Sequence, residues 1–206
     1  MKKTILLIAL SILLVNCNSK NNAPVIDASR SKAINEIVAA IIVQDSLNVS
    51  KKDKDTNLFC IDLAKLNIQN PAKRKDGMIE PPAKPLNTVL FENLMLAKFN
   101  NELFFTKIDS ITLVEQNQNP EKFRINPEII SKINATTLDG ILKKRKKGES
   151  YQFYQMTIPL FSLDGNKAYT QLTYGCEGLC GNGKAIYLKK INGKWNIIDT
   201  FRIWMN

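Results

Sequence analysis

The spacing of apolar residues changes from helical to alternating along this chain. Between residues 29 and 47 the apolar positions recur with helical period, which makes this stretch the clearest predicted helix. Ser29 or Ser31 can cap its start. Its apolar stripe consists of Ile34, Ile37, Val38, Ile41 and Ile42. A stripe of this width predicts that the helix packs on a sheet.

The middle of the chain carries shorter signals of both kinds. Helical spacing recurs at 88–99, 106–116 and 138–147, and in 106–116 the apolar face consists of Ile108, Ile111 and Val114. The run 58–66 fits either a buried strand or a short helix, and we favour the strand; 128–133 is predicted as a short strand. The stretch 67–87 contains four prolines and is predicted as a long surface loop.

From Tyr151 onward the period becomes two, which is typical of strands. The predicted strands are 151–161, 167–175, 184–191 and 195–204. Asn192-Gly193, between the last two, is the strongest short-range hairpin signal. We therefore predict an α+β fold class: N-terminal helices packed on a C-terminal antiparallel four-stranded meander, with 29–206 as a single domain.

The amino terminus predicts export. Lys2 and Lys3 precede an apolar run over 5–15, which is shorter than the roughly twenty residues of a membrane-spanning helix. Leu14-Val15-Asn16-Cys17 follows and resembles the lipobox of bacterial lipoproteins. An ordinary secretory signal, with Cys17 incidental, is the alternative.

The lipobox resemblance implies cleavage before Cys17 and a diacylglycerol on its thiol. It divides the start of the chain into a signal peptide, 1–16, and a lipidated tether, 17–28. The tether lacks the acidic run that directs some lipoproteins to the cell surface. The expected location is therefore the cell envelope, anchored in the outer membrane and facing the periplasm, with the membrane as the first partner.

The chain is basic, with a formal net charge of +10 that becomes +8 when residues 1–16 are removed. This charge favours an anionic lipid or glycan as partner, beside an unknown protein partner, and export argues against nucleic acid. The densest run of cations is Lys143, Lys144, Arg145, Lys146 and Lys147. It is either a solvated helix end or an anion patch that binds an acidic surface.

The chemistry of the chain is limited because it has no histidine. Catalytic triads with histidine and histidine-containing zinc sites are excluded. Cys176 and Cys180, in a glycine-rich loop, predict a disulfide in an oxidising compartment, with a redox-active thiol pair, a metal contact or two free thiols as alternatives. Cys60 lies in an apolar run and is predicted to be a buried thiol. We assign no catalytic residue, metal or cofactor.

The stretch from Cys176 to Trp195 resembles the C-terminal part of a group of bacterial exported proteins with a Cys-Gly-x-Leu-Cys-Gly-x-Gly loop and a later Asn-Gly-Lys-Trp. In this chain Glu177 occupies the first glycine position of that loop. The resemblance implies no activity, and a helix on a curved sheet is also similar to the NTF2-like cone. We predict a non-enzymatic lipoprotein with a binding or envelope role; a thiol-redox protein or small enzyme using Cys176 and Cys180, or anionic-surface binding through Lys143–Lys147, are the alternatives.

Overall fold

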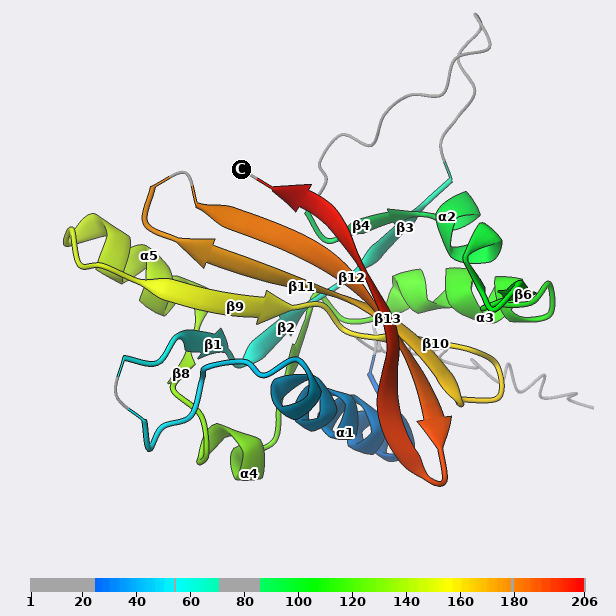
Figure 1. Ribbon diagram of the computed structural model, residues 1–206, viewed down its shortest axis with the longest axis horizontal. Coiled ribbons are helices and arrows are strands. Elements are labelled where there is room, and N and C mark those ends of the chain that lie inside the picture. Colours follow the sequence, from blue (N-terminus) through cyan, green and yellow to red (C-terminus); the bar gives the residue numbers. More distant parts are fainter. Residues whose placement is uncertain (1–24, 54, 71–85, 179, 206) are drawn as a thin grey trace, which may run out of the picture.

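The computed structural model describes residues 25–53, 55–70, 86–178 and 180–205 (Figure 1). The predicted signal peptide and Cys17 lie outside these residues. In chain order the elements are α1 (Ala28–Gln44), β1 (Leu58–Cys60), β2 (Asp62–Ala64), β3 (Asn67–Gln69), β4 (Thr88–Leu90), α2 (Phe91–Leu96), β5 (Lys98–Phe99), β6 (Glu102–Leu103), α3 (Asp109–Glu115), the 3₁₀ turn η1 (Gln116–Gln118), β7 (Lys122–Arg124), α4 (Pro127–Ile130), β8 (Ala135–Thr136), α5 (Leu138–Lys146), β9 (Gln152–Met156), β10 (Leu160–Phe161), β11 (Lys167–Cys176), β12 (Gly181–Ile191) and β13 (Lys194–Met205).

The largest sheet has seven strands in the order β13-β12-β11-β9-β1-β8, with β10 added to β11. The pairs β9–β11, β11–β12 and β12–β13 are antiparallel. In contrast, β1 runs parallel to β9, and β8 runs parallel to β1. The sheet is therefore mixed.

The predicted fold class is wrong, because the N-terminal half supplies strands to this sheet as well as helices. Leu58 and Phe59 of β1 pair with Phe153 and Tyr154 of β9. Strands β1 and β8 have three and two residues, too few to show an alternating pattern. The four-stranded meander is thus only one part of a seven-stranded sheet, and neither the predicted arrangement nor the NTF2-like cone describes the structure.

Both faces of the sheet are covered. Along β11, Ala168 and Leu172 belong to one core cluster with the α1 residues Ile34, Ile37, Val38 and Ile41. Tyr169, which points to the opposite face, belongs to a second cluster with residues of α2, α3 and β12. The apolar stripe predicted for α1 is therefore confirmed at these four positions, although Asp27, and neither Ser29 nor Ser31, caps the helix.

Other local predictions have mixed outcomes. The helix at 138–147 is confirmed as α5, and the Asn192-Gly193 hairpin is confirmed, with positive φ at both residues. The predicted strand at 128–133 is wrong, since Asn126 caps the short helix α4 at this place. The apolar face predicted for 106–116 is also wrong, because the buried side of α3 contains Asp109 and Leu113.

The direction of β11 gives the molecule two ends. Its ten residues span roughly 30 Å. At the end of the molecule where β11 begins, the start of α1, α3 and the turn 162–166 meet. We call this the Val25 end. At the other, the Cys176 end, the end of α1 lies beside β12 and the segment after α5 pairs with Cys176. Figure 1 shows α5 and β10 at these opposite ends. None of the helices in the described ranges is long and apolar enough to cross a bilayer.

Candidate ligand-binding cleft

A cleft of about 660 Å³ opens at the Val25 end. Its walls are the first turns of α1, the end of α3 with η1, the turn between β10 and β11, and Lys190 of β12. These segments are far apart in the sequence, and they meet because α1 lies along the sheet with its start beside β10. The lining includes Arg30, Gln116 and Phe161, which contact one another.

Gln116 joins η1 to β10 and is 5% exposed. Its amide nitrogen donates to the carbonyl oxygens of Phe161, at 2.9 Å, and Thr112, at 3.0 Å. Its amide oxygen accepts from the backbone N–H of Phe161 at 2.9 Å. The side chain therefore satisfies both backbone groups of Phe161, which would otherwise be buried without partners.

Arg30 is held by the same amide. Its Nη2 donates to Gln116 Oε1, and its guanidinium carbon lies 5.5 Å from the centre of the Phe161 ring. No carboxylate among the described residues lies within ion-pair distance of Arg30, and its buried Nε has no acceptor there. Burial lowers the pKa of the Arg30 guanidinium, and the charge of Asp27 opposes this effect. Arg30 is thus a partly desolvated cation with unused donors.

The acidic residues around the cleft are mostly engaged with other groups. Asp27 accepts from the backbone N–H of Arg30 at 2.8 Å and so caps α1. Asp164 accepts from Ser162 Oγ and the N–H of Asn166, and these hydrogen bonds lower the pKa of its carboxyl group. Glu36 lies 4.0 Å from Lys32 and 3.9 Å from Lys190. Glu115, the fourth carboxylate of the lining, is exposed. Of the lining cations in the described residues, Lys32 and Lys190 lie near Glu36, whereas Arg30 has no carboxylate within ion-pair distance.

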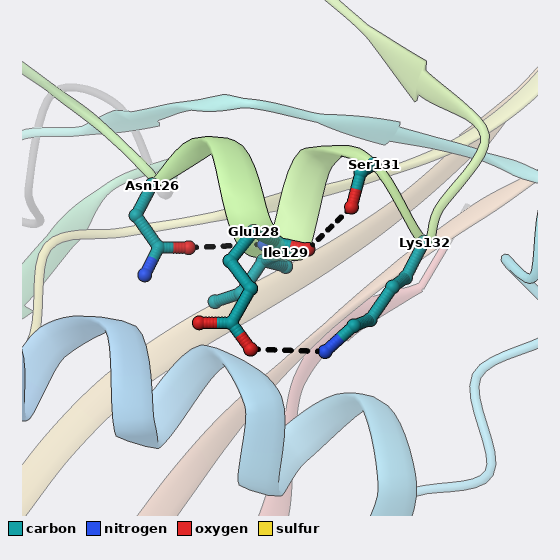
Figure 2. Close-up of polar contacts among 5 residues, drawn as sticks. All are labelled: Asn126, Glu128, Ile129, Ser131 and Lys132. Carbon is teal, nitrogen blue, oxygen red and sulfur yellow. Dashed lines mark hydrogen bonds and ion pairs between the residues drawn. The ribbon is translucent and has the colours of Figure 1, made fainter.

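A second cavity, of about 730 Å³, lies between α1 and α4. Figure 2 shows Glu128 of α4 and Lys132, which follows α4, extending toward α1; the two form a 3.1 Å ion pair. Asn126 accepts from the N–H of Ile129 at 3.0 Å and caps α4. The wall of this groove is largely aliphatic, with Ile42, Val43 and Ile129. It has no desolvated charge comparable to Arg30, so the cleft is the stronger candidate site.

The predicted disulfide is confirmed: Cys176 and Cys180 are bonded, with Cα atoms 5.7 Å apart. The bond closes the tip of the β11–β12 hairpin, whose last paired residues are Gly175 and Gly181. Glycine is also required at Gly183, where a Cβ atom would lie 2.0 Å from Nε1 of Trp204 on β13. The glycines of this stretch therefore allow close packing of strands and rings.

Cys60 is buried and free, as predicted. Burial, with a smaller contribution from Asp62, raises the pKa of its thiol to about 12. A thiol with this pKa stays protonated and unreactive at neutral pH. Across the described part of the chain, no group of three or more cysteine, aspartate or glutamate side chains is placed to hold a metal ion.

The predicted anion patch lies at the Cys176 end. Lys143, Lys144, Arg145 and Lys146 occupy the last turn of α5, and Lys147 caps it, where cations suit the partial negative charge of the helix end. Lys144 and Lys147 lie 3.1 Å and 3.7 Å from Glu149. The anion patch remains a prediction, and it is separated from the cleft by the length of β11.

The residues of the cleft were not predicted as a site from the sequence. Arg30 is one cation in the first turn of a predicted helix, and Gln116 is one amide among several polar residues at 115–119. Only the docking of α1 and η1 against β10 brings them together. Comparisons with protein-family models, curated proteins and solved structures found no match.

Replacing Gln116 with leucine tests its structural role. Gln116→Leu leaves the N–H and C=O of Phe161 without their partner and is expected to lower the free energy of unfolding by about 2 to 5 kcal/mol. Gln118→Leu, at an exposed position of the same turn, is expected to change it by less than about 0.5 kcal/mol. Urea unfolding followed by circular dichroism measures both. Equal effects would contradict the role given to Gln116.

Removing the disulfide tests whether it has more than a local structural role. The loop that it closes is short, so Cys176→Ser with Cys180→Ser is expected to lower the free energy of unfolding by about 2 kcal/mol and to keep the fold. Thermal unfolding with and without reductant measures this. Complete loss of the folded state would show that the bond holds more of the structure than the hairpin tip.

Proposed function

We propose that this chain is a lipoprotein anchored through Cys17, located in the outer membrane and facing the periplasm, that binds a small anionic ligand in the Arg30 cleft. The anchoring part rests on the lipobox resemblance at residues 14–17. The binding part rests on one observation, the partly buried guanidinium of Arg30 without a carboxylate partner among the described residues. The preferred ligand carries a carboxylate or phosphate group.

The geometry of Arg30 supports recognition of such a group. A guanidinium presents several N–H donors in one plane and matches the two oxygens of a carboxylate or phosphate. Gln116 and the ring of Phe161 hold that plane in place before any ligand arrives. Because the guanidinium is already partly desolvated, an anion that reaches it gains more than it would at a fully exposed arginine.

The size and the rim of the cleft fit a small molecule. A volume of about 660 Å³ lies within the range of roughly 300 to 1,000 Å³ that ligand pockets occupy. Lys32 and Lys190 flank the opening, although both lie near Glu36. The ligand therefore needs one anionic group for Arg30 and a polar body for the remaining surface.

Binding is favoured over catalysis by the contacts of Ser162, whose hydroxyl group lies beside a carboxylate in the cleft. Ser162 Oγ donates to Asp164 Oδ1, but it also accepts from the backbone N–H of Lys167 at 3.0 Å. These contacts build the turn 162–166 and hold the hydroxyl within it. A nucleophile has to point at the substrate with a base beside it, and Ser162 is instead committed to the turn.

Titration with inorganic phosphate tests the anion site. For the full chain in detergent, phosphate is expected to raise the thermal midpoint in a saturable way, because it binds the folded state. Arg30→Lys removes the planar fork and is expected to weaken the apparent affinity about tenfold or more. Arg145→Lys, on exposed α5, is the matched control and is expected to leave the affinity unchanged. The same loss in both variants would refute a site at Arg30.

Cell fractionation tests the anchor. The wild-type chain expressed in a Gram-negative host is expected in the outer-membrane fraction, protected from added protease until that membrane is permeabilised. Cys17→Ser is expected to move the chain to the soluble periplasmic fraction, whereas Cys60→Ser leaves it in the membrane. Membrane association that survives Cys17→Ser would refute the lipid anchor.

A further inference from the structure

The outer side of α3 and the residue that precedes it expose three branched aliphatic side chains. Ile108, Ile111 and Val114, which we call the α3 stripe, are 72%, 70% and 48% exposed. They are spaced by three residues, so they lie within an arc of about 120° on the helix. Leu163, 62% exposed, lies on the turn that adjoins α3. The three side chains of the α3 stripe, together with Leu163, form an exposed apolar patch of the kind that marks an interaction surface.

The inner side of α3 fixes the orientation of this stripe. Asp109 is buried and accepts hydrogen bonds from the N–H of Thr106, at 2.7 Å, and of Leu163, at 2.9 Å. Leu113 packs in the second core cluster. With the carboxylate and one leucine turned inward and tied to the adjoining turn, α3 cannot rotate to bury its stripe without losing both sets of contacts.

The α3 stripe lies at the end of the molecule where the tether enters. Thr112 and Glu115 of α3 line the same cleft as Asp27 and Ser29 at the start of α1. Seven residues lie between Cys17 and Val25, and the eight steps from one to the other reach at most about 30 Å. A lipid on Cys17 would therefore keep the Val25 end within about 30 Å of the bilayer, whereas α5 with its cations lies at the opposite end of β11.

We propose that the α3 stripe and Leu163 form the surface that rests on the lipid bilayer beside the anchor. This inference rests on the proposed acylation of Cys17. Aliphatic side chains at this position enter the boundary between headgroups and acyl chains, as the apolar faces of interfacial helices do. Lys107, exposed next to Ile108, and Lys32, with its side chain 79% exposed on α1, supply cations for the headgroups.

The inference also gives the cleft a direction. The start of α1 and the end of α3 are shared by the cleft and by the surface next to the stripe, so a domain resting on the stripe keeps Arg30 within reach of the membrane surface. The anion patch of α5 and the disulfide hairpin then extend away from the bilayer. If the domain instead rested on the anion patch of α5, it would have the opposite orientation.

Lipid quenching of a fluorophore tests this orientation. The full chain is purified from host membranes with Ile111→Cys, Leu163→Cys or Leu142→Cys, labelled with the polarity-sensitive dye NBD and reconstituted into phosphatidylcholine–phosphatidylglycerol vesicles that contain a doxyl-labelled lipid. The native cysteines do not compete, because Cys60 is buried and Cys176 is bonded to Cys180, while mass spectrometry reports acylation of Cys17. Leu142, 51% exposed on α5, is the control.

Quenching at least threefold stronger at positions 111 and 163 than at position 142 is the expected result. Equal quenching at all three positions, or stronger quenching at 142, would overturn the inference while acylated Cys17 leaves the anchor intact. A blue-shifted but unquenched dye at 111 would mean that a protein or a second copy covers the stripe, which also overturns it. Absence of acylation would instead refute the proposed anchor, and the inference with it.

Discussion

Strand β10 has two residues and a strand partner, β11, on one side only. The amide of Gln116 takes the place of the missing partner by pairing with both backbone groups of Phe161. The same device recurs where Gln44 of α1 bonds the carbonyl of Trp195 and the N–H of Ile197 on β13. Asn117 likewise pairs with both backbone groups of Ile68. Buried backbone groups need partners, so these amides fix how α1 and η1 sit against the strands.

The cleft is a consequence of this constraint. Gln116 must lie against Phe161 to satisfy its backbone, and its oxygen then accepts a bond from Arg30 as well. The guanidinium lies over the Phe161 ring, whereas Asp27 caps α1 and makes no ion pair with it. One structural amide thus holds a partly desolvated cation in the lining of an open cleft. Gln116 contributes both to the stability of the fold and to the proposed binding site. A Gln116 variant would change both properties at once, so binding is tested with variants of Arg30.

The features that were predictable from the sequence are those whose signal is local. The periodic apolar stripe predicts the helix α1, and Asn192-Gly193 predicts the β12–β13 hairpin. Two cysteines in a glycine-rich loop predict the disulfide. Strands of two or three residues, such as β1 and β8, have no period to detect, and their place in the sheet is decided by long-range pairing. The prediction that the apolar face of 106–116 is buried failed for a related reason. The spacing shows that Ile108 and Ile111 share a face, but it does not show that the opposite face, with Asp109, is the buried one. The Arg30 cleft is assembled wholly by tertiary contacts.

The central claim is that the Arg30 guanidinium is held open for an anion. Nuclear magnetic resonance of the Nε–Hε groups of arginine, in the full chain in detergent micelles, observes that group directly while inorganic phosphate is added, and Arg30→Lys assigns its signal. The Arg30 signal is expected to shift in a saturable way, whereas the Arg145 signal is expected to move little and without saturation. An Arg30 signal that stays fixed while Arg145 responds would contradict the claim.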